Sequence, residues 1–388
     1  MVTPDAPGPF VTPAYGTRSL ADLLDSAYAV LGAGGTDRLG LAAALPGVRR
    51  IVVLLVDGLG AHLLPLATPV APALAAATVL TPLTCGFPST TPTSLVSLGA
   101  GTPPGAHGVV GFTVRRPDTG RPFTHIHWDD DVDPRQWQPV PSRFDTARSD
   151  GLSGQVVAPA AFSGTGLTVA AYGDARYRGA DAAGTVAAVS AALAATPRGV
   201  VYAYRPEVDR AGHRAGPGSP VWLAAVAAVD RVVAGIAAAL PADAALLVVA
   251  DHGMVRATED DRIDLDSRPE LLAGTRLITG EGRARYVHVE PGASTDVLAA
   301  WRAVLGDRAL VVSRDEAIAS GWYGPTTHTA AARIGDVVAV CRDRWVLVRR
   351  AAEPVESSFA GNHGSLTEAE LRVPLLLLRP GQTVVPRG

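Results

Sequence analysis

Short runs of apolar residues recur along the chain and alternate with longer stretches in which apolar positions repeat at helical spacing. Runs that are almost continuously apolar are typical of strands buried on both faces of a parallel sheet. The clearest are residues 50–57, 199–204 and 245–250, and shorter candidates are residues 155–157, 168–171 and 373–378. Helices are expected over residues 20–31, 91–98, 183–195 and 221–239. Strands alternating with helices predict an α/β fold with a mostly parallel central sheet and helices on both faces.

The pattern changes after Met254, where the chain becomes more polar and richer in arginine. Residues 283–290 predict a strand with alternating faces, and residues 295–305 predict a helix. A hairpin is expected from residues 337–340 and 345–348 around a turn at residues 342–344. We therefore expect a catalytic core formed by residues 1–255 and 356–388, interrupted by a small α+β insertion over residues 256–355.

The composition is that of a folded globular protein, with 47% hydrophobic and 18% charged residues. A formal net charge of −3 gives no electrostatic footprint for nucleic acid. The N-terminal residues lack the basic and apolar regions of a signal peptide, and the longest apolar stretch, residues 222–240, carries Asp230 and Arg231. We therefore expect a cytoplasmic protein without a membrane partner, with free buried thiols at Cys85 and Cys341. The oligomeric state stays open.

Acidic residues stand at or just after the ends of the buried strands. Asp57 and Asp251 end two of them, and Asp209 follows a third by a short loop. Ligands in open parallel sheets bind outside the carboxyl ends of the strands. Three carboxylates at one sheet edge repel one another unless cations lie between them, so the set suggests a metal site. Each Asp taken alone could equally belong to an ordinary turn.

Three histidines accompany these carboxylates. His213 follows Asp209 at the i+4 position, which places both side chains on one face of a helical turn. His252 adjoins Asp251, and a turn at the strand end would let both reach one cluster. His363 lies in the loop Gly-Asn-His-Gly, whose glycines permit a tight bend, although a surface histidine is the simpler reading of that loop alone.

A cluster of hydroxyl residues, Ser89, Thr90 and Thr91, opens the helix expected over residues 91–98. Free N–H groups and the helix dipole favour an anion at this position, which suits a nucleophilic hydroxyl. A helix-capping role is the common alternative. A hydroxyl nucleophile becomes credible only beside a metal that lowers its pKa.

Taken together and in this order, these residues resemble the alkaline phosphatase superfamily, and most of all its nucleotide pyrophosphatase/phosphodiesterase (type I phosphodiesterase) family. The resemblance includes the turn from Gly101 to His107 and Gly108, and the family nucleophile lies ten residues before that first glycine, at Thr91. It implies an alkaline-phosphatase-like core with one zinc held by Asp209, His213 and His363. The implied ligands of a second zinc are Asp57, Thr91, Asp251 and His252. Manganese is the alternative metal.

One position departs from the family pattern. Well-studied members have an asparagine five residues after the turn histidine, where it helps to bind a phosphate oxygen, and this chain has Phe112. Oxyanion stabilisation is expected instead from the zincs, from backbone N–H groups near Pro92, or from an arginine such as Arg115, Arg176 or Arg178. Phe112, Arg176 and Arg178 are the candidate substrate-binding residues. His107 is expected to be structural, and His125 and His127 to lie at the surface.

The resemblance implies a dizinc hydrolase that cleaves a small phosphodiester or nucleotide pyrophosphate through a phosphothreonine intermediate. A phosphonate or phosphomonoester hydrolase on the same metal site is the alternative. An isomerase like the cofactor-independent phosphoglycerate mutases is disfavoured, because the inserted domain that they carry after the nucleophile helix is much larger than the stretch found here. A sulfatase is set aside because the segment at Cys85 breaks the required Cys- or Ser-x-Pro-x-Arg spacing.

Overall fold

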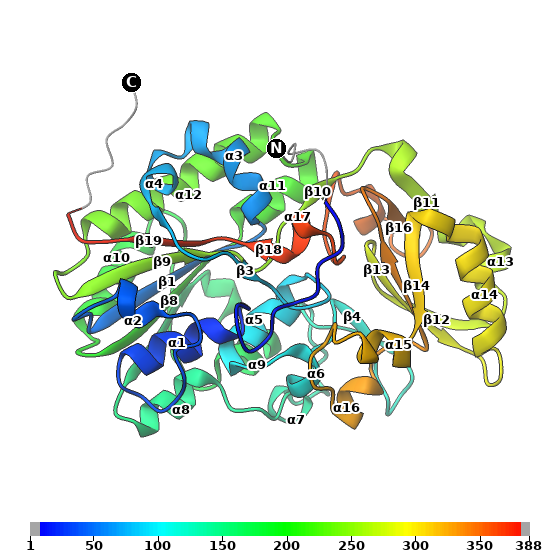
Figure 1. The fold of residues 1–388 in the computed structure, drawn as a ribbon, viewed down its shortest axis with the longest axis horizontal. Coiled ribbons are helices and arrows are strands. Elements are labelled where there is room, and N and C mark those ends of the chain that lie inside the picture. The colour runs from blue at the N-terminus through cyan, green and yellow to red at the C-terminus, as the bar shows by residue number, and fades with distance from the viewer. Residues whose placement is uncertain (1–7, 382–388) are drawn as a thin grey trace.

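The structure, a computed structural model, describes residues 8–381 and is built on a seven-stranded sheet (Figure 1). The strands, in order across the sheet, are β2 (Thr78–Val79), β19 (Leu375–Leu378), β9 (Ala244–Val249), β1 (Arg50–Val56), β8 (Gly199–Arg205), β6 (Ser153–Ala158) and β7 (Arg176–Gly179). Neighbours from β9 to β7 pair in parallel, whereas β19 runs antiparallel to both β9 and β2. The mostly parallel sheet confirms the predicted α/β class.

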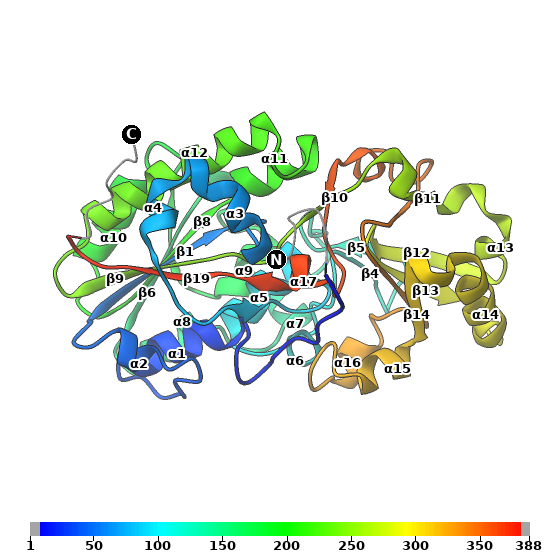
Figure 2. The ribbon, with the colours of Figure 1, turned by 45° about the horizontal axis from the view of Figure 1, so that its top comes forward.

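Helices cover both faces of this sheet, as the two ribbon views show (Figure 2). One face carries α1 (Asp22–Val30), α2 (Leu41–Ala44), α5 (Thr91–Ala100), α8 (Arg143–Ser149) and α9 (Gly166–Tyr172). The other carries α3 (Leu64–Ala67), α4 (Pro72–Ala76), α10 (Thr185–Ala194), α11 (Glu207–Ala215) and α12 (Pro220–Ala238). Further short elements are α6 (Pro104–His107), α7 (Pro134–Trp137), α17 (Glu368–Leu371), β3 (Leu83–Thr84), β4 (Thr113–Arg115), β5 (Pro122–Thr124) and β18 (Arg372–Val373).

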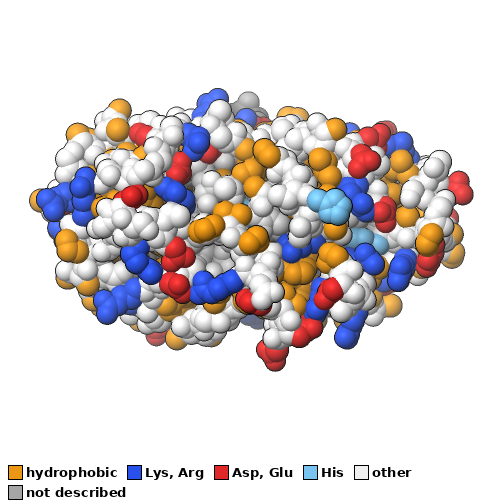
Figure 3. All heavy atoms as spheres, turned by 90° about the horizontal axis from the view of Figure 1, so that it is seen from below, with side chains coloured by type: hydrophobic (Ala, Val, Ile, Leu, Met, Phe, Trp, Pro, Cys, Tyr) orange, Lys and Arg blue, Asp and Glu red, His pale blue; other side chains and the backbone are white. Residues whose placement is uncertain are grey.

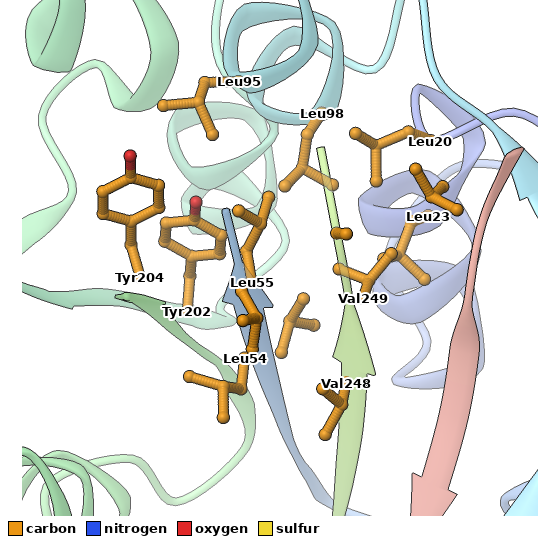
Figure 4. Packing of buried hydrophobic residues seen from close by; sticks show 14 of the residues in the cluster. Leu20, Leu23, Leu54, Leu55, Leu95, Leu98, Tyr202, Tyr204, Val248 and Val249 are labelled. Carbon is orange, nitrogen blue, oxygen red and sulfur yellow. The ribbon is translucent and has the colours of Figure 1, made fainter. Parts of the chain in front are cut away.

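The central strands are buried because apolar side chains point to both faces. Every residue of β1 after Arg50 is fully buried, and Leu54 and Leu55 point to opposite sides of the sheet. Leu95 and Leu98 of α5 pack over one face near Leu55 (Figure 4). The nucleophile helix is thereby fixed against the strands that carry the acidic residues.

Within residues 8–381, α12 is the one helix long and apolar enough to cross a membrane by length and composition alone. It packs against α4, α10 and β9. Its buried Asp230 accepts hydrogen bonds from the backbone N–H groups of Ala73 (3.1 Å) and Leu74 (2.8 Å). This carboxylate therefore caps the first turn of α4, which explains an acidic residue in so apolar a helix.

A second, antiparallel sheet lies beside the main one and is formed largely by residues after β10 (Val255–Arg256). Its strands, in order, are β12 (Thr275–Glu281), β13 (Ala284–Val289), β15 (Val337–Cys341) and β14 (Ala309–Ser313). The associated elements are β11 (Arg262–Asp264), β16 (Val346–Val348), α13 (Pro269–Leu272), α14 (Ser294–Leu305), α15 (Arg314–Ala319) and α16 (His328–Ala331). The chain re-enters the core at β17 (Gly361–Asn362), which pairs with β10. The boundaries at residues 255 and 356 stay a prediction.

Three local expectations were wrong. Residues 168–171 belong to helix α9, whose first turn is capped by the Thr165 hydroxyl, because so short an apolar run carries no periodicity that separates strand from helix. Residues 337–348 form no hairpin: β15 lies between β13 and β14, and β16 pairs in parallel with β11. Strand β13 is buried on both faces rather than alternating. Cys85 and Cys341 are free and buried, as predicted.

Candidate metal centre

The register of the central strands sets two carboxylates level with each other. Leu55 of β1 lies opposite Val249 of β9, so Asp57 and Asp251 follow at equivalent positions beyond the strand ends. The backbone N–H of Gly58 donates to Asp251 Oδ1 (3.0 Å). The Tyr204 hydroxyl, from the neighbouring strand β8, donates to Asp57 Oδ2. Both carboxylates are thus held at the carboxyl edge of the sheet, each with one oxygen left over.

A first cluster joins Asp209, His213 and His363. Asp209 and His213 lie one turn apart on α11, with Oδ1 and Nε2 3.4 Å from each other. His363 arrives from the loop after β17, and its Nε2 lies 3.2 Å from His213 Nε2 and 3.8 Å from Asp209 Oδ1. Three candidate ligand atoms therefore converge from two segments far apart in the sequence.

A second cluster joins Asp57, Asp209 and His252. His252 Nε2 lies 3.4 Å from Asp57 Oδ1 and 3.7 Å from Asp251 Oδ2. The Thr91 hydroxyl lies 3.2 Å from the same nitrogen. Asp209 belongs to both clusters, whereas the family resemblance implies it as a ligand in the first alone. The two clusters are therefore contiguous, and the rings of His252 and His363 stack with centroids 3.7 Å apart.

All three histidines are oriented by backbone carbonyls. The Nδ1 atoms lie 2.8 Å from Gly361 O for His213, 2.9 Å from Gly253 O for His252 and 2.9 Å from Ser89 O for His363. A protonated Nδ1 donates in each case, which leaves Nε2 as the lone-pair nitrogen directed into the cluster. This tautomer and orientation are those of metal-ligating histidines.

Four buried carboxylate oxygens within residues 8–381 have no hydrogen-bond partner: Asp57 Oδ1, Asp209 Oδ1 and Asp251 Oδ2, which belong to the clusters, and Glu281 Oε1 beside them. Burial raises the pKa of Asp209 to about 6 and that of Asp251 well above its usual range. Burial opposes a charge on His252, yet the carboxylates of Asp251 and Asp57 outweigh it and raise its pKa. Unpaired buried acceptors crowded together are costly without a cation. This donor set fits two divalent ions.

Among the hydroxyls at the start of α5, only Thr91 faces the clusters. Ser89 is engaged elsewhere: its hydroxyl donates to Ser365 O (2.7 Å) and accepts from the Gly364 N–H (3.1 Å). Thr90 is the N-cap of α5, is fully buried, and forms no side-chain cap hydrogen bond. Thr91 is the first residue of the helix and is partly exposed to the site. The three neighbouring hydroxyl groups therefore have different surroundings, and only that of Thr91 lies beside the clusters.

The family model for type I phosphodiesterase/nucleotide pyrophosphatase matches residues 51–366, which spans both clusters and Thr91. The chain belongs to the type I phosphodiesterase/nucleotide pyrophosphatase family. It is accordingly a hydrolase with the metal-dependent chemistry of that family. Comparison with curated proteins finds no match.

Solved structures show the same fold at low sequence identity. Murine ectonucleotide pyrophosphatase/phosphodiesterase 5 is 18% identical, with a TM-score of 0.68 over 84% of this chain and 87% of that chain. An inactive variant of the murine protein in complex with AMP gives a TM-score of 0.69 at 18% identity over the same shares of the two chains. Phosphonoacetate hydrolase from Sinorhizobium meliloti 1021, in complex with phosphonoformate, gives 0.65 at 20% identity over 89% and 92% of the two chains. The type I phosphodiesterase fold is therefore shared with enzymes whose substrates differ.

A cavity of about 390 Å³ opens beside the first cluster, between His213 and His363 on one side and the second sheet on the other. Phe112 lines it, in the place where well-studied family members carry asparagine. Arg176 and Arg178 lie on the edge strand β7 outside this lining, and Arg178 Nε donates to Gln155 (2.8 Å). Their role in substrate binding stays a prediction.

The other histidines divide between structural and open positions. His107 is buried, with Nε2 2.9 Å from the Ser97 hydroxyl and Nδ1 accepting from the Val109 N–H (3.1 Å), and burial lowers its pKa to about 3. His125 was expected at the surface and is instead buried, because Phe123 and Trp137 enclose it and the Trp137 indole donates to its Nε2 (3.0 Å). His127 is exposed and lines the cavity.

Two residues of the site were missed in the sequence. Tyr204, which holds Asp57, carried no signal beyond its place one residue before the end of β8. Glu281 lines the cavity at the tip of the β12–β13 hairpin, with Oε2 3.6 Å from His363 Nδ1. The short run Gly280-Glu281-Gly282 is the one hint in the sequence that a side chain is presented there at close quarters.

The raised pKa values predict how pH acts on the metal-free protein. Burial raises the pKa of Asp209 from 3.8 to about 6 in the folded protein. The contribution of this group to the free energy of unfolding is therefore fully present below pH 3.8 and is lost as pH rises through 6, where the buried carboxyl group must ionise. Divalent ions compete with the same protons, so their stabilisation grows over that window. We expect the difference in Tm between zinc-loaded and chelator-treated protein to be larger at pH 7 than at pH 5. An equal or larger difference at pH 5 would contradict this reading of the carboxylates.

Proposed function

We propose that the protein is a dizinc hydrolase that cleaves phosphodiesters or nucleotide pyrophosphates through a phosphothreonine at Thr91. The observation that carries the proposal is the position of the Thr91 hydroxyl, at the N-terminus of α5 and 3.2 Å from His252 Nε2. It is supported by the contiguous ligand clusters that share Asp209. Three His nitrogens with carboxylate oxygens form a borderline-hard donor set that suits zinc and also accepts manganese.

Two divalent ions so held would stabilise the attacking and leaving oxygens and lower the pKa of the Thr91 hydroxyl. Thr91 Oγ1 forms a bond to phosphorus as the bond to one ester oxygen breaks. The proton lost from Thr91 is balanced by the proton that the departing alcohol gains. Water then attacks the phosphothreonine, which restores the hydroxyl and releases a phosphomonoester. Asp209 and His252 would contribute as ligands that hold these ions.

The negative charge on the oxygens of the transferred phosphoryl group must be stabilised without the asparagine that well-studied family members use. The first turn of α5 begins at Thr91 and is not capped by the Thr90 side chain, which leaves its N–H groups and helix dipole to act on an anion at Thr91. Phe112 supplies an apolar wall instead of an amide donor. The helix N-terminus, together with the metal ions that the clusters would hold, is therefore the proposed source of oxyanion stabilisation.

We expect a preference for diesters over monoesters. The arginines that line the cavity are already paired, Arg285 with Glu353 (2.7 Å) and Arg349 with Asp266 (3.2 Å), so no unpaired guanidinium there rewards the extra charge of a dianion. kcat/KM for bis(p-nitrophenyl) phosphate should exceed that for p-nitrophenyl phosphate by about tenfold or more, which corresponds to about 1.4 kcal/mol. Both assays follow p-nitrophenol release from zinc-loaded protein. A clear preference for the monoester would overturn the assignment and direct attention to Arg176 or Arg178.

Phosphonate hydrolysis is the second candidate, because the fold is shared with phosphonoacetate hydrolase. A carboxylated phosphonate adds an anionic group that needs a cationic partner, and both arginines of the cavity lining are occupied. We therefore expect phosphonoacetate to be turned over far more slowly than a diester. Release of inorganic phosphate from phosphonoacetate, measured beside diester cleavage, decides between the two.

A further inference from the structure

Glu281 is placed beside the metal centre by the tip of the β12–β13 hairpin. Gly280 has φ +86° and passes so close to Ala284 O that an added Cβ would lie 2.2 Å from it, so only glycine allows this turn. On the other side, an added Cβ at Gly364 would lie 2.7 Å from Glu281 Cγ. The second sheet and the loop that carries His363 thus approach each other around this one carboxyl side chain.

The carboxyl group of Glu281 is poorly satisfied within residues 8–381. Its side chain is only 11% exposed, and Oε1 has no hydrogen-bond partner of normal geometry. Oε2 lies 3.6 Å from His363 Nδ1, but that nitrogen donates to Ser89 O at 2.9 Å. The nearby Thr90 hydroxyl acts on the same carboxyl group and has no other partner among the described residues, so it is the one protein donor available to Glu281. A buried acceptor left in this state costs free energy that a bound donor would recover.

The arginines that line the cavity make their hydrogen bonds to groups other than Glu281. Arg285 makes hydrogen bonds to both oxygens of Glu353 (3.0 and 2.7 Å) and to Leu347 O (3.0 and 2.8 Å). The guanidinium of Arg349 is bonded to Asp266. The remaining wall is largely apolar, with Ile278 and Val346 among its residues. A substrate group that carries a hydrogen-bond donor would therefore be favoured beside the Glu281 carboxyl group, whereas a second anionic group would not.

We infer that Glu281 is a specificity-determining residue: the cavity takes an ester substituent that carries an amino or hydroxyl group, and Glu281 Oε1 accepts a hydrogen bond from it. This inference rests on the proposed diester hydrolysis and adds the class of substituent. A volume of about 390 Å³ suits a small substituent. A site built to hydrogen-bond a donor discriminates strongly against an analogue that lacks it, because its own polar group then stays unpaired.

The test uses three phenyl diesters of phosphate whose second substituent is 2-aminoethyl, 2-hydroxyethyl or propyl. Phosphorus NMR follows their hydrolysis by the zinc-loaded full-length protein, so that cleavage of either ester bond is counted. We expect kcat/KM to be about tenfold or more higher for at least one of the two donor-bearing diesters than for the propyl diester. Comparison of the amino and hydroxyl compounds shows which donor the site prefers.

The preference should disappear in Glu281→Leu, which removes the acceptor, and persist in Glu290→Leu, a matched loss of a carboxylate just beyond the other end of the same hairpin. Thermal unfolding checks that both variants are folded, and Glu281→Ala repeats the comparison without bulk in the cavity. Equal cleavage of the three diesters by the parent protein, or a preference that survives in the Glu281 variants, would overturn the inference while leaving diester hydrolysis intact. Failure of the parent to cleave any of them would instead refute the proposed function itself.

Discussion

Replacing Thr91 with alanine is expected to abolish turnover while leaving the fold and most metal binding intact. The hydroxyl is the only one at the start of α5 that faces His252, at 3.2 Å from Nε2, and the Asp and His ligands do not depend on it. Loss of a nucleophile costs on the order of 10⁴-fold or more in kcat. The measurement is kcat for bis(p-nitrophenyl) phosphate with zinc-loaded parent and variant, accompanied by metal analysis of both.

Thr90→Ala is the matched control, because it removes the same hydroxyl one residue earlier. Thr90 is the N-cap of α5 without a side-chain cap hydrogen bond, so we expect only a mild effect on kcat and on Tm. If Thr90→Ala proved inactive and Thr91→Ala active, the assignment of the nucleophile would be wrong by one residue. Trapping phosphate on Thr91 in acid-quenched parent protein would support the proposed intermediate directly.

Replacing Asp209 with asparagine is expected to disrupt both metal positions at once. Asp209 belongs to both ligand clusters, and its Oδ1 is one of the buried oxygens without a hydrogen-bond partner. We expect the metal content to fall well below that of the parent and kcat to fall by on the order of 10³-fold or more, since the site loses its shared ligand. The exposed Asp260 provides a control, and Asp260→Asn should leave both quantities unchanged.

The same variant separates loss of function from loss of fold. Burial raises the pKa of Asp209 to about 6, so its charge destabilises the metal-free protein at neutral pH. Metal-free Asp209→Asn should therefore unfold at a Tm no lower than that of metal-free parent at pH 7. A variant that lost activity through a much lower Tm, or one that kept full metal content, would contradict a shared ligand at this position.

Much of the candidate ligand set could be predicted from the sequence because its signals are local. The apolar runs within residues 50–57 and 245–250 predict strands buried on both faces, which the structure forms as β1 and β9, and an acidic residue follows each strand at one sheet edge. The i,i+4 spacing of Asp209 and His213 survives in α11 because a helix turn preserves it. Sequence order then distinguishes this set from unrelated Asp-Gly turns.

The rest depends on contacts that no local pattern records. Glu281 reaches the site only because the tip of the β12–β13 hairpin meets the loop at Gly364. That Asp209 belongs to both clusters is visible only in the folded chain, where His252 and His363 lie stacked beside each other. The expected hairpin over residues 337–348 failed for the same reason: β15 takes its partners from β13 and β14, which come earlier in the chain.

Surface charge indicates no particular class of binding partner. On the face drawn in Figure 3, acidic and basic side chains are interspersed, in keeping with the formal net charge of −3. Such a surface favours neither nucleic acid nor an anionic membrane on that face. Substrate selection is therefore expected to arise inside the cavity, at Phe112 and Glu281, and not from long-range steering.

The metal content of the purified protein decides whether the two ligand clusters hold two ions. Protein reconstituted with zinc and freed of unbound metal should contain two divalent ions per chain by elemental analysis, and removal of both by a chelator should abolish diester hydrolysis until zinc is returned. Manganese in place of zinc at the same stoichiometry would leave the dinuclear site in place and change only the metal. A content well below two per chain after reconstitution, or full activity in the chelator-treated protein, would contradict a catalytic dinuclear site.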